Sequence, residues 1–298
     1  MVLVFVLGAG LVVGTAVALL AHRWPVIAAP KVSGETIVSG VAEHPRFADH
    51  LRKQFDPKTA TGVALIIATA LVLASAVGIG LVVAMIRTHA GLAAWDLKFA
   101  KYGAQHASHT ATVVMKDISR LASTPVVIAL GLVVTVVATI RHPSKALPMF
   151  MVLVIGGQLV ISNSIKYLVE RARPDIDRLT GAVGSSFPSG HSTAAAATFA
   201  AVALVLTRNK SRRVKIAGAA IAAGLAAMVA STRVLLGVHW LTDVVAGLLL
   251  GWGWFALCSI AFGGRLLSFG QPVEKAADVA EATPPADAPT VDSTTMAG

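Results

Sequence analysis

Long apolar blocks are the feature that most constrains what this chain can fold into. Seven blocks of roughly 20 residues are dominated by apolar side chains, and a helix of that length crosses the hydrocarbon core of a bilayer. The blocks cover residues 2–21, 61–86, 125–140, 146–165, 191–207, 214–231 and 243–262. Only 13% of the 298 residues are charged, about half the share in an ordinary soluble domain. The sequence therefore predicts an all-α integral membrane protein.

The positions of basic residues predict the orientation of these spans. The connections 141–145 (RHPSK) and 208–215 (RNKSRRVK) are short and rich in Lys and Arg, and such loops stay cytoplasmic. Alternation then places the connections 87–124, 166–190 and 232–242 on the extracytoplasmic side. The net charge of +10 fits basic loops beside anionic lipid. We expect no nucleic-acid partner, because no continuous basic face carries interleaved aromatic residues.

Three segments outside the spans have distinct compositions. Residues 33–60 and 92–121 mix apolar and charged residues at helical spacing, which is typical of amphipathic helices at a membrane interface. Residues 266–298 contain few large apolar side chains, so we expect a disordered cytoplasmic tail. The first apolar block lacks a basic leader, although ALLA before His22 loosely resembles a signal-peptide cleavage site. We expect an uncleaved anchor there.

Polar residues gather at three outward span ends, and the first group follows the fourth block. Lys166 and Arg173 are seven residues apart, so they share one face if the helix continues to Pro174. Two cations on one face suit an anion such as phosphate. Ordinary snorkelling of interfacial cations is the alternative reading.

The second group, FPSGH, stands immediately before the fifth block and ends at His191. Ser189 is a natural N-cap, and Gly190 lets the backbone approach a ligand closely. The free amides at a helix N-terminus bind anions, and His191 would project toward such an anion. A plain capped helix with an interfacial histidine is the simpler alternative.

The third group contains Arg233, His239 and Asp243. The histidine and the aspartate are four residues apart, which makes them neighbours on one face of a helix. A carboxylate on one imidazole nitrogen fixes the tautomer and leaves the other nitrogen basic. This arrangement suits a histidine nucleophile, although a structural pair at a helix start has the same spacing.

The three groups together resemble the signature of the type 2 phosphatidic acid phosphatase superfamily, K-x6-RP, PSGH and SR-x5-H-x3-D. The chain reads KYLVERARP at 166–174, PSGH at 188–191 and TRVLLGVHWLTD at 232–243. The one departure is Thr232, which stands where the pattern has serine. The resemblance covers about 61–262 and implies a six-helix core bundle, to which this chain adds one N-terminal transmembrane helix.

The resemblance also implies domain boundaries and residue roles. The N-terminal anchor and cytoplasmic amphipathic segment would span 1–60, the membrane phosphatase core 61–265 and the tail 266–298. His239 would be the nucleophile that forms a phosphohistidine, Asp243 would orient its ring, and His191 would protonate the leaving oxygen. The implied phosphate-binding residues are Lys166, Arg173, Ser189, Gly190 and Arg233. The family is metal-independent, so no metal ion or other cofactor is expected.

The substrate class implied by the resemblance is a lipid phosphate at the extracytoplasmic face of a bacterial plasma membrane. Undecaprenyl diphosphate is favoured because an outward site suits recycling of a carrier lipid, and phosphatidic acid and phosphatidylglycerophosphate are the alternatives. Two readings from other classes also remain. A vanadium haloperoxidase shares the oxyanion pocket but is soluble, and a lipid transporter could bind phosphate without cleaving it. The oligomeric state is left open.

Overall fold

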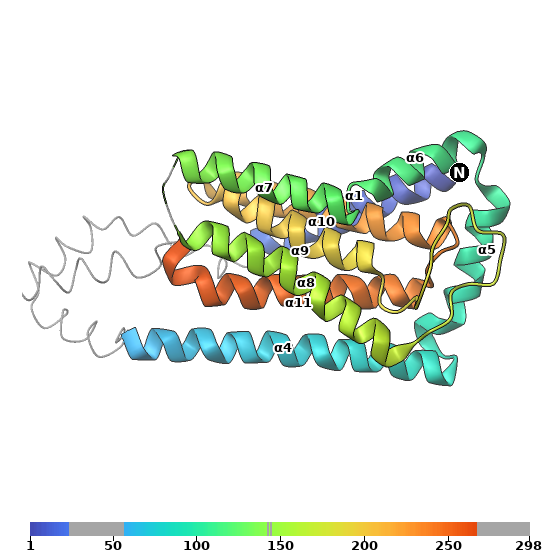
Figure 1. The fold of residues 1–298 in the computed structure, drawn as a ribbon, viewed down its shortest axis with the longest axis horizontal. Coiled ribbons are helices and arrows are strands. Elements are labelled where there is room, and N and C mark those ends of the chain that lie inside the picture. Colours follow the sequence, from blue (N-terminus) through green and yellow to red (C-terminus); the bar gives the residue numbers. More distant parts are fainter. Residues whose placement is uncertain (24–56, 142, 144, 267–298) are drawn as a thin grey trace, which may run out of the picture. The chain divides into compact units, whose positions relative to one another are not determined.

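The computed structural model describes residues 1–23, 57–141, 143 and 145–266. Every regular element within these ranges is a helix (Figure 1). The helices are α1 (Val2–Arg23), α4 (Pro57–Thr88), η2 (Gly91–Trp95), α5 (Asp96–His106), α6 (His109–Arg120), α7 (Thr124–Arg141), α8 (Ala146–Val169), α9 (Gly190–Thr207), α10 (Arg212–Leu235) and α11 (Leu241–Leu266). The predicted tail from 267 onward and the predicted amphipathic segment up to 56 lie outside the described residues.

Six of the described helices are long and apolar enough to cross a membrane, namely α1, α7, α8, α9, α10 and α11. A seventh span is reached if Val72–Thr88 of α4 and the following Gly91–His106, bent by 53° from it, count as one. Each predicted apolar block falls on one of these helices or on α4. The prediction of an all-α integral membrane protein is therefore confirmed.

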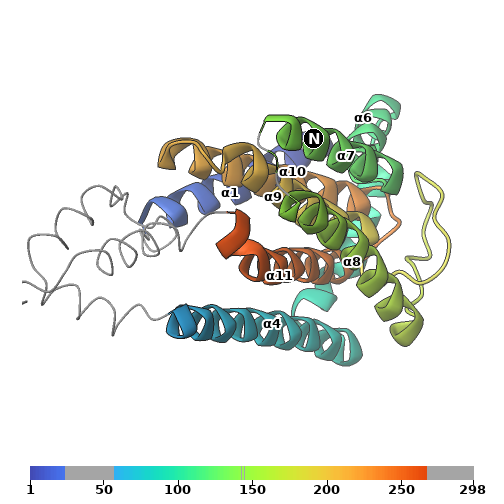
Figure 2. The same ribbon diagram turned by 60° about the vertical axis from the view of Figure 1, so that its left-hand side comes forward.

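Small residues bring α1 into close contact with α10, far along the chain (Figure 2). A Cβ added at Gly224 would lie 2.8 Å from the carbonyl oxygen of Gly10, and one added at Gly14 would lie 2.9 Å from that of Ala220. Both helices thus present small residues four positions apart, the pattern that lets membrane helices approach closely. This contact places α1 in one compact unit with residues 67–262.

A second set of glycines joins α11 to the start of α9. A Cβ at Gly247 would lie 2.7 Å from the carbonyl oxygen of Ser189, and one at Gly251 would lie 2.4 Å from that of Thr193. Ala246 of α11 also clusters with Phe187 and with Val82 of α4. Phe187, the residue before the PSGH segment, is therefore packed between α4 and α11.

The end of α8 differs from the sequence-based expectation. The helix ends at Val169, because Glu170 adopts a left-handed conformation with φ 43° and closes the helix with its amide on the carbonyl of Lys166. Residues 171–189 then form an irregular loop. The condition under which Lys166 and Arg173 would share a helix face is not met, since the helix stops four residues before Arg173.

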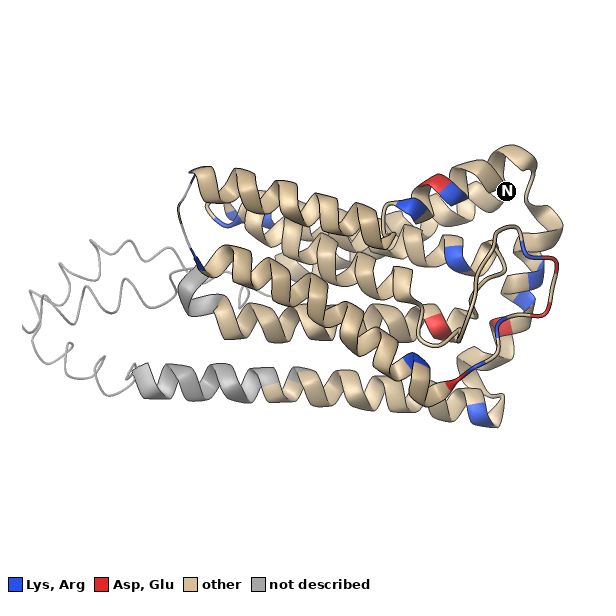
Figure 3. Cartoon of the chain, in the orientation of Figure 1, with Lys and Arg blue, Asp and Glu red and all other residues tan. Residues whose placement is uncertain are grey.

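The predicted amphipathic stretch 92–121 forms η2, α5 and α6, which precede α7. Where α5 crosses the end of α10, a Cβ on Gly103 would lie 2.1 Å from the carbonyl oxygen of Leu235. Only glycine fits this crossing, so α5 is fixed against the bundle. Figure 3 shows that the basic turns between α7 and α8 and between α9 and α10 lie at one end of the helices, and that α5 and the 170–189 loop lie at the other.

Candidate active site

His239 and Asp243 meet at the start of α11. Asp243 is the third residue of the helix, and its Oδ2 accepts a hydrogen bond of 3.0 Å from the amide of Trp240, the residue before the helix. An acid that reaches back to this amide stabilises a helix start. His239 precedes Trp240, and its Nδ1 lies 3.4 Å from the same Oδ2. The predicted pair exists, but a helix start brings it together rather than one face of a continuous helix.

The ring of His239 is held in one protonation state. Its Nε2 lies 3.3 Å from Nη1 of Arg173, and a guanidinium offers only donors, so Nε2 accepts and the ring proton lies on Nδ1, toward Asp243. Burial lowers the pKa of His239 to about 4, although the neighbouring Asp243 acts in the opposite direction. His239 is therefore a neutral imidazole at physiological pH, with a lone pair on Nε2.

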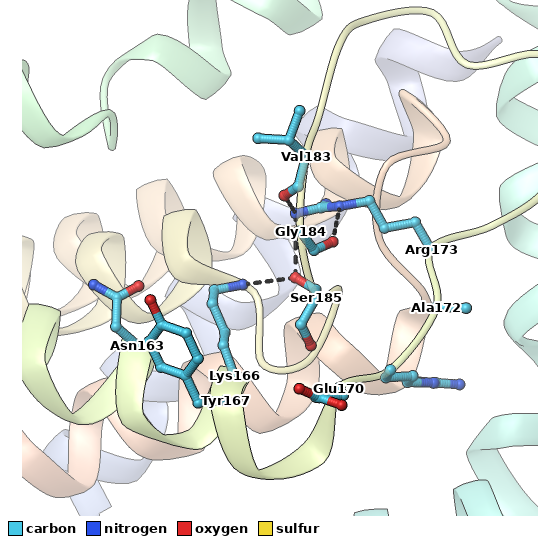
Figure 4. Close-up of a pocket in the computed structure, with 10 residues that line it drawn as sticks. Asn163, Lys166, Tyr167, Glu170, Ala172, Arg173, Val183, Gly184 and Ser185 are labelled. Atoms are coloured by element: carbon cyan, nitrogen blue, oxygen red, sulfur yellow. Dashed lines mark hydrogen bonds between the residues drawn. The ribbon is translucent and has the colours of Figure 1, made fainter.

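Lys166 and Arg173 converge on one backbone carbonyl. Lys166 Nζ donates to the oxygen of Ser185 at 3.1 Å, and Arg173 Nη2 donates to the same oxygen at 3.2 Å (Figure 4). Arg173 also binds the carbonyls of Gly184 and Val238. Burial lowers the pKa of the Arg173 guanidinium, with Asp243 opposing the shift. The loop that follows α8 thus brings the two cations together without a shared helix face.

Arg233 contributes a third cation from the end of α10. Its side chain is buried, and Nη1 donates to Oγ of Ser119 on α6 at 2.7 Å. Its Nε is buried and has no hydrogen-bond partner among the described residues. A buried guanidinium with an open donor is suited to bind an anion.

The start of α9 supplies the predicted anion-binding N-terminus. Ser189 is the N-cap, and its Oγ accepts from the amide of Ser192 at 3.4 Å and from the hydroxyl of Ser192 at 3.0 Å. The amide of Ser189 binds the carbonyl of Asp243 at 3.0 Å, which ties the PSGH segment to α11. A Cβ on Gly190 would lie 3.9 Å from Cε of Lys166, so this helix start faces the lysine.

His191 lies in the first turn of α9 and is partly buried. The cations Arg233, Lys166 and Arg173 lie close enough for their charges to act on its ring, and the neutral His239 is also near it. The two histidines and the three cations from separate segments therefore share one electrostatic environment.

A pocket of about 620 Å³ opens beside Lys166 and Arg173 (Figure 4). Asn163, Tyr167 and Glu170 line it together with the carbonyl-bearing loop 183–185. These three residues carry no spacing signal in the sequence, and sequence reasoning missed them. The pocket is large enough for a phosphate and part of the group attached to it.

Sequence reasoning also missed three supporting residues. Ser119 holds Arg233, while Asp96 and Arg171 form an ion pair at 2.8 Å next to Asp243. Arg171 lies inside KYLVERARP but does not fit its spacing pattern, and Asp96 is 75 residues away from it in the sequence. No local signal could identify them, because the crossing of α5 and α6 over the bundle and the loop after α8 create these contacts.

The site unites a neutral imidazole backed by a carboxylate, three cations, a helix N-terminus and a second histidine. Such a set can bind a tetrahedral oxyanion and stabilise charge on it during attack by Nε2. Within the described part of the chain, no cluster of three or more His, Cys, Asp and Glu side chains could hold a metal ion.

Comparisons with known proteins point to one family. Residues 147–266 match the family model described as "PAP2 superfamily". The chain is 38% identical over 106 residues to phosphatidylglycerophosphatase B of Bacillus subtilis, covering 35% of this chain and 52% of that protein. It is 37% identical over 145 residues to lipid A 1-phosphatase of Rhizobium etli, covering 43% of this chain and 56% of that protein. The chain thus spans little more than half the length of these relatives.

The fold is similar to a solved structure as well. The crystal structure of a transmembrane PAP2 type phosphatidylglycerolphosphate phosphatase from Bacillus subtilis superposes with a TM-score of 0.60 and 25% identity. The match covers 66% of this chain and 98% of the other. Nearly all of that smaller protein therefore has a counterpart here.

Proposed function

Because residues 147–266 match the PAP2 superfamily model, we propose that this integral membrane protein is a lipid phosphatase that acts through His239. The observation that carries the proposal is the position of that ring. Its Nδ1 faces Asp243 and its Nε2 faces Arg173, so the basic nitrogen points to the cation that would bind the phosphate. The named relatives, a phosphatidylglycerophosphatase and a lipid A phosphatase, support the reaction class.

The proposed reaction has two displacements at phosphorus. Nε2 of His239 attacks the terminal phosphorus, its bond to the bridging oxygen that stays with the lipid product breaks, and His191 supplies the proton that this oxygen needs. The carboxylate of Asp243 stabilises the positive charge that develops on the ring. A water molecule then gives a proton to His191 and attacks the phosphohistidine, the P–N bond breaks, and inorganic phosphate leaves with both imidazoles restored. Lys166, Arg173 and Arg233, with the α9 start at Ser189 and Gly190, would stabilise the non-bridging oxygens.

We place undecaprenyl diphosphate first among the substrates, because the basic loops orient the site toward the extracytoplasmic side, where a carrier lipid is recycled. Phosphatidic acid and phosphatidylglycerophosphate are the alternatives of the same class. The substrate named for the second relative, lipid A, joins them as a candidate. All four lipids carry their phosphate in the headgroup layer of the membrane. The ends of the spans that carry the three motifs lie at the same depth.

The proposed location is the bacterial plasma membrane, with the site outside and the C-terminus in the cytoplasm. The chain has one cysteine, Cys258, and it is buried. In a Cys258→Ser background, a cysteine at Val183 should react with a membrane-impermeant thiol reagent in intact cells, and one at Lys210 should react only after lysis. The reversed pattern would contradict the orientation.

A phosphate-release panel tests the proposed function. The purified full chain, in detergent and without added metal, is given undecaprenyl diphosphate, phosphatidylglycerophosphate, phosphatidic acid and lipid A. We expect phosphate release from at least one of them, and its loss in His239→Ala at unchanged expression and thermal stability. No release from any lipid would contradict the phosphatase assignment and would favour a transporter.

A further inference from the structure

The carboxylate of Asp243 divides its two oxygens between different partners. Oδ2 faces Nδ1 of His239 and the amide of Trp240. Oδ1 accepts from Nη1 of Arg171 at 2.5 Å. The side chain of Asp243 is fully buried, so its orientation depends entirely on these protein contacts.

Arg171 is itself clamped from several sides. Nη1 also donates to the hydroxyl of Thr242 at 2.7 Å, and Nη2 donates to Oδ2 of Asp96 at 2.8 Å. The guanidinium carbon lies 5.4 Å from the centre of the Trp240 ring, within the range of a cation–π contact. A planar guanidinium that is held on two edges and one face has little freedom to turn.

Asp96 closes the network from α5. It is 4% exposed, and its two oxygens accept from the amide of Thr242 at 2.9 Å and from the hydroxyl of Thr242 at 2.7 Å. The contact of Gly103 with the Leu235 carbonyl fixes the same helix on α10. Asp96 therefore connects a helix outside the matched segment 147–266 to the first turn of α11.

We propose that Asp96 and Arg171 are positioning residues that fix Asp243, and through it the ring of His239, for attack on phosphorus. The charges support this role, because one guanidinium lies between two buried carboxylates and leaves Oδ2 of Asp243 directed at the imidazole. Neither residue belongs to the three motif patterns. The proposal rests on the proposed phosphatase function.

The test compares Asp96→Asn and Arg171→Lys with the wild-type chain, using the lipid that gives the highest phosphate release. Asp96→Asn keeps the size of the side chain and removes the charge that faces Arg171. Arg171→Lys keeps the charge and loses the fork that reaches both carboxylates. We expect kcat to fall by about tenfold to a hundredfold, the range seen when hydrogen-bond partners that orient metal ligands are changed. KM should stay within about twofold, a factor worth well under 1 kcal/mol.

The matched control is Asp117→Asn on α6, an exposed aspartate that pairs with Arg120 and is not part of the network. It should turn over like wild type. A spectroscopic readout separates positioning from a loss of folding: in folded Asp96→Asn, the ¹⁵N resonances of His239 should lose the single Nδ1-protonated pattern of wild type.

The outcomes are distinguishable. Wild-type kcat in both variants, or a kcat that falls only in proportion to the folded fraction, overturns the positioning role. A rise in KM at constant kcat also overturns it, because it would assign these residues to substrate binding. If Asp96→Asn does not fold, the kcat and KM of Arg171→Lys alone decide whether the positioning role holds. Absence of phosphate release by the wild-type chain would instead contradict the proposed function itself.

Discussion

Nη1 of Arg173 lies 3.3 Å from Nε2 of His239, so a cation suited to hold phosphate stands beside the nitrogen suited to attack it. Arg173 is in turn fixed by the carbonyls of Val183, Gly184 and Val238. These carbonyls leave the guanidinium little freedom to move. A phosphate bound by Arg173 would therefore lie within reach of Nε2 of His239.

The first prediction concerns the protonation of His239. Burial lowers its pKa from 6.5 to about 4, so the ring should stay neutral and protonated on Nδ1 at pH 5.5. Proton-coupled ¹⁵N spectra of histidine-labelled protein in detergent, assigned with His239→Gln, measure this directly. A ring that titrates near 6.5 would contradict the buried geometry.

The same pKa has a consequence for stability. Between about pH 4 and 6.5, the unfolded chain binds a proton on this ring and the folded chain does not. The unfolded state therefore holds more protons in that window, and stability falls as the pH falls through it. His239→Gln should weaken this pH dependence of the melting temperature, and an identical pH profile in the variant would argue against a buried neutral ring.

Arg173→Lys should reduce kcat/KM by about a hundredfold, which corresponds to about 2.7 kcal/mol of transition-state stabilisation. Lysine keeps the positive charge but cannot bind the 183–185 carbonyls and face Nε2 of His239 at the same time. Steady-state phosphate release measures the effect. Arg120→Lys is the matched control, because Arg120 is largely exposed. Equal kcat/KM in both variants would show that Arg173 does not bind phosphate.

His191→Ala should affect lipid phosphates much more than an activated aryl phosphate. A poor leaving oxygen needs a proton from the enzyme, whereas an activated phenolate leaves without one. We expect a loss of about 100-fold or more on the lipid and less than about tenfold on the aryl ester. His109→Ala, at the start of α6, is the control. An equal loss on both substrates would assign His191 to binding.

Gly247→Ala should impair activity although Gly247 is not itself a motif residue. The added Cβ would lie 2.7 Å from the carbonyl of Ser189, so it would displace the start of α9 from α11. Overpacking of this kind typically costs about 1–3 kcal/mol. Gly156→Ala is the control, since a Cβ there meets no atom within 4 Å. The prediction is checked by measuring the melting temperature and the rate of phosphate release of both variants. Equal melting temperatures and equal rates in the two variants would contradict it.

The spans and the three motif clusters could be predicted from the sequence because they depend on local patterns. Apolar length marks α7 and α8 within a few residues, and the serine before Gly190 marks the start of α9. The left-handed turn at Glu170 could not be predicted in the same way. Nothing in KYLVERARP places the break four residues before Arg173, and the condition for a shared helix face is not met there.

The supporting contacts were beyond sequence reasoning for a different physical reason. Asp96 and Ser119 act on side chains more than 70 residues away, and only the crossing of α5 and α6 over the bundle brings them there. The small-residue contact of α1 with α10 could not be predicted either, because the close approach of Gly10 and Gly224 can be recognised only once the two helices are known to pair. Motif spacing in the sequence identifies the proposed catalytic and phosphate-binding residues. The residues that hold them in place can be identified only from the tertiary fold.

Trapping the phosphoenzyme identifies directly the residue that carries phosphate during turnover. Wild-type protein and His239→Ala are mixed with the preferred lipid, quenched in base, where phosphohistidine survives, and analysed by peptide mass spectrometry. We expect phosphate on His239 in the wild-type chain and no phosphopeptide or turnover in the variant. Full phosphate release by folded His239→Ala, or phosphate on a different residue, would contradict it.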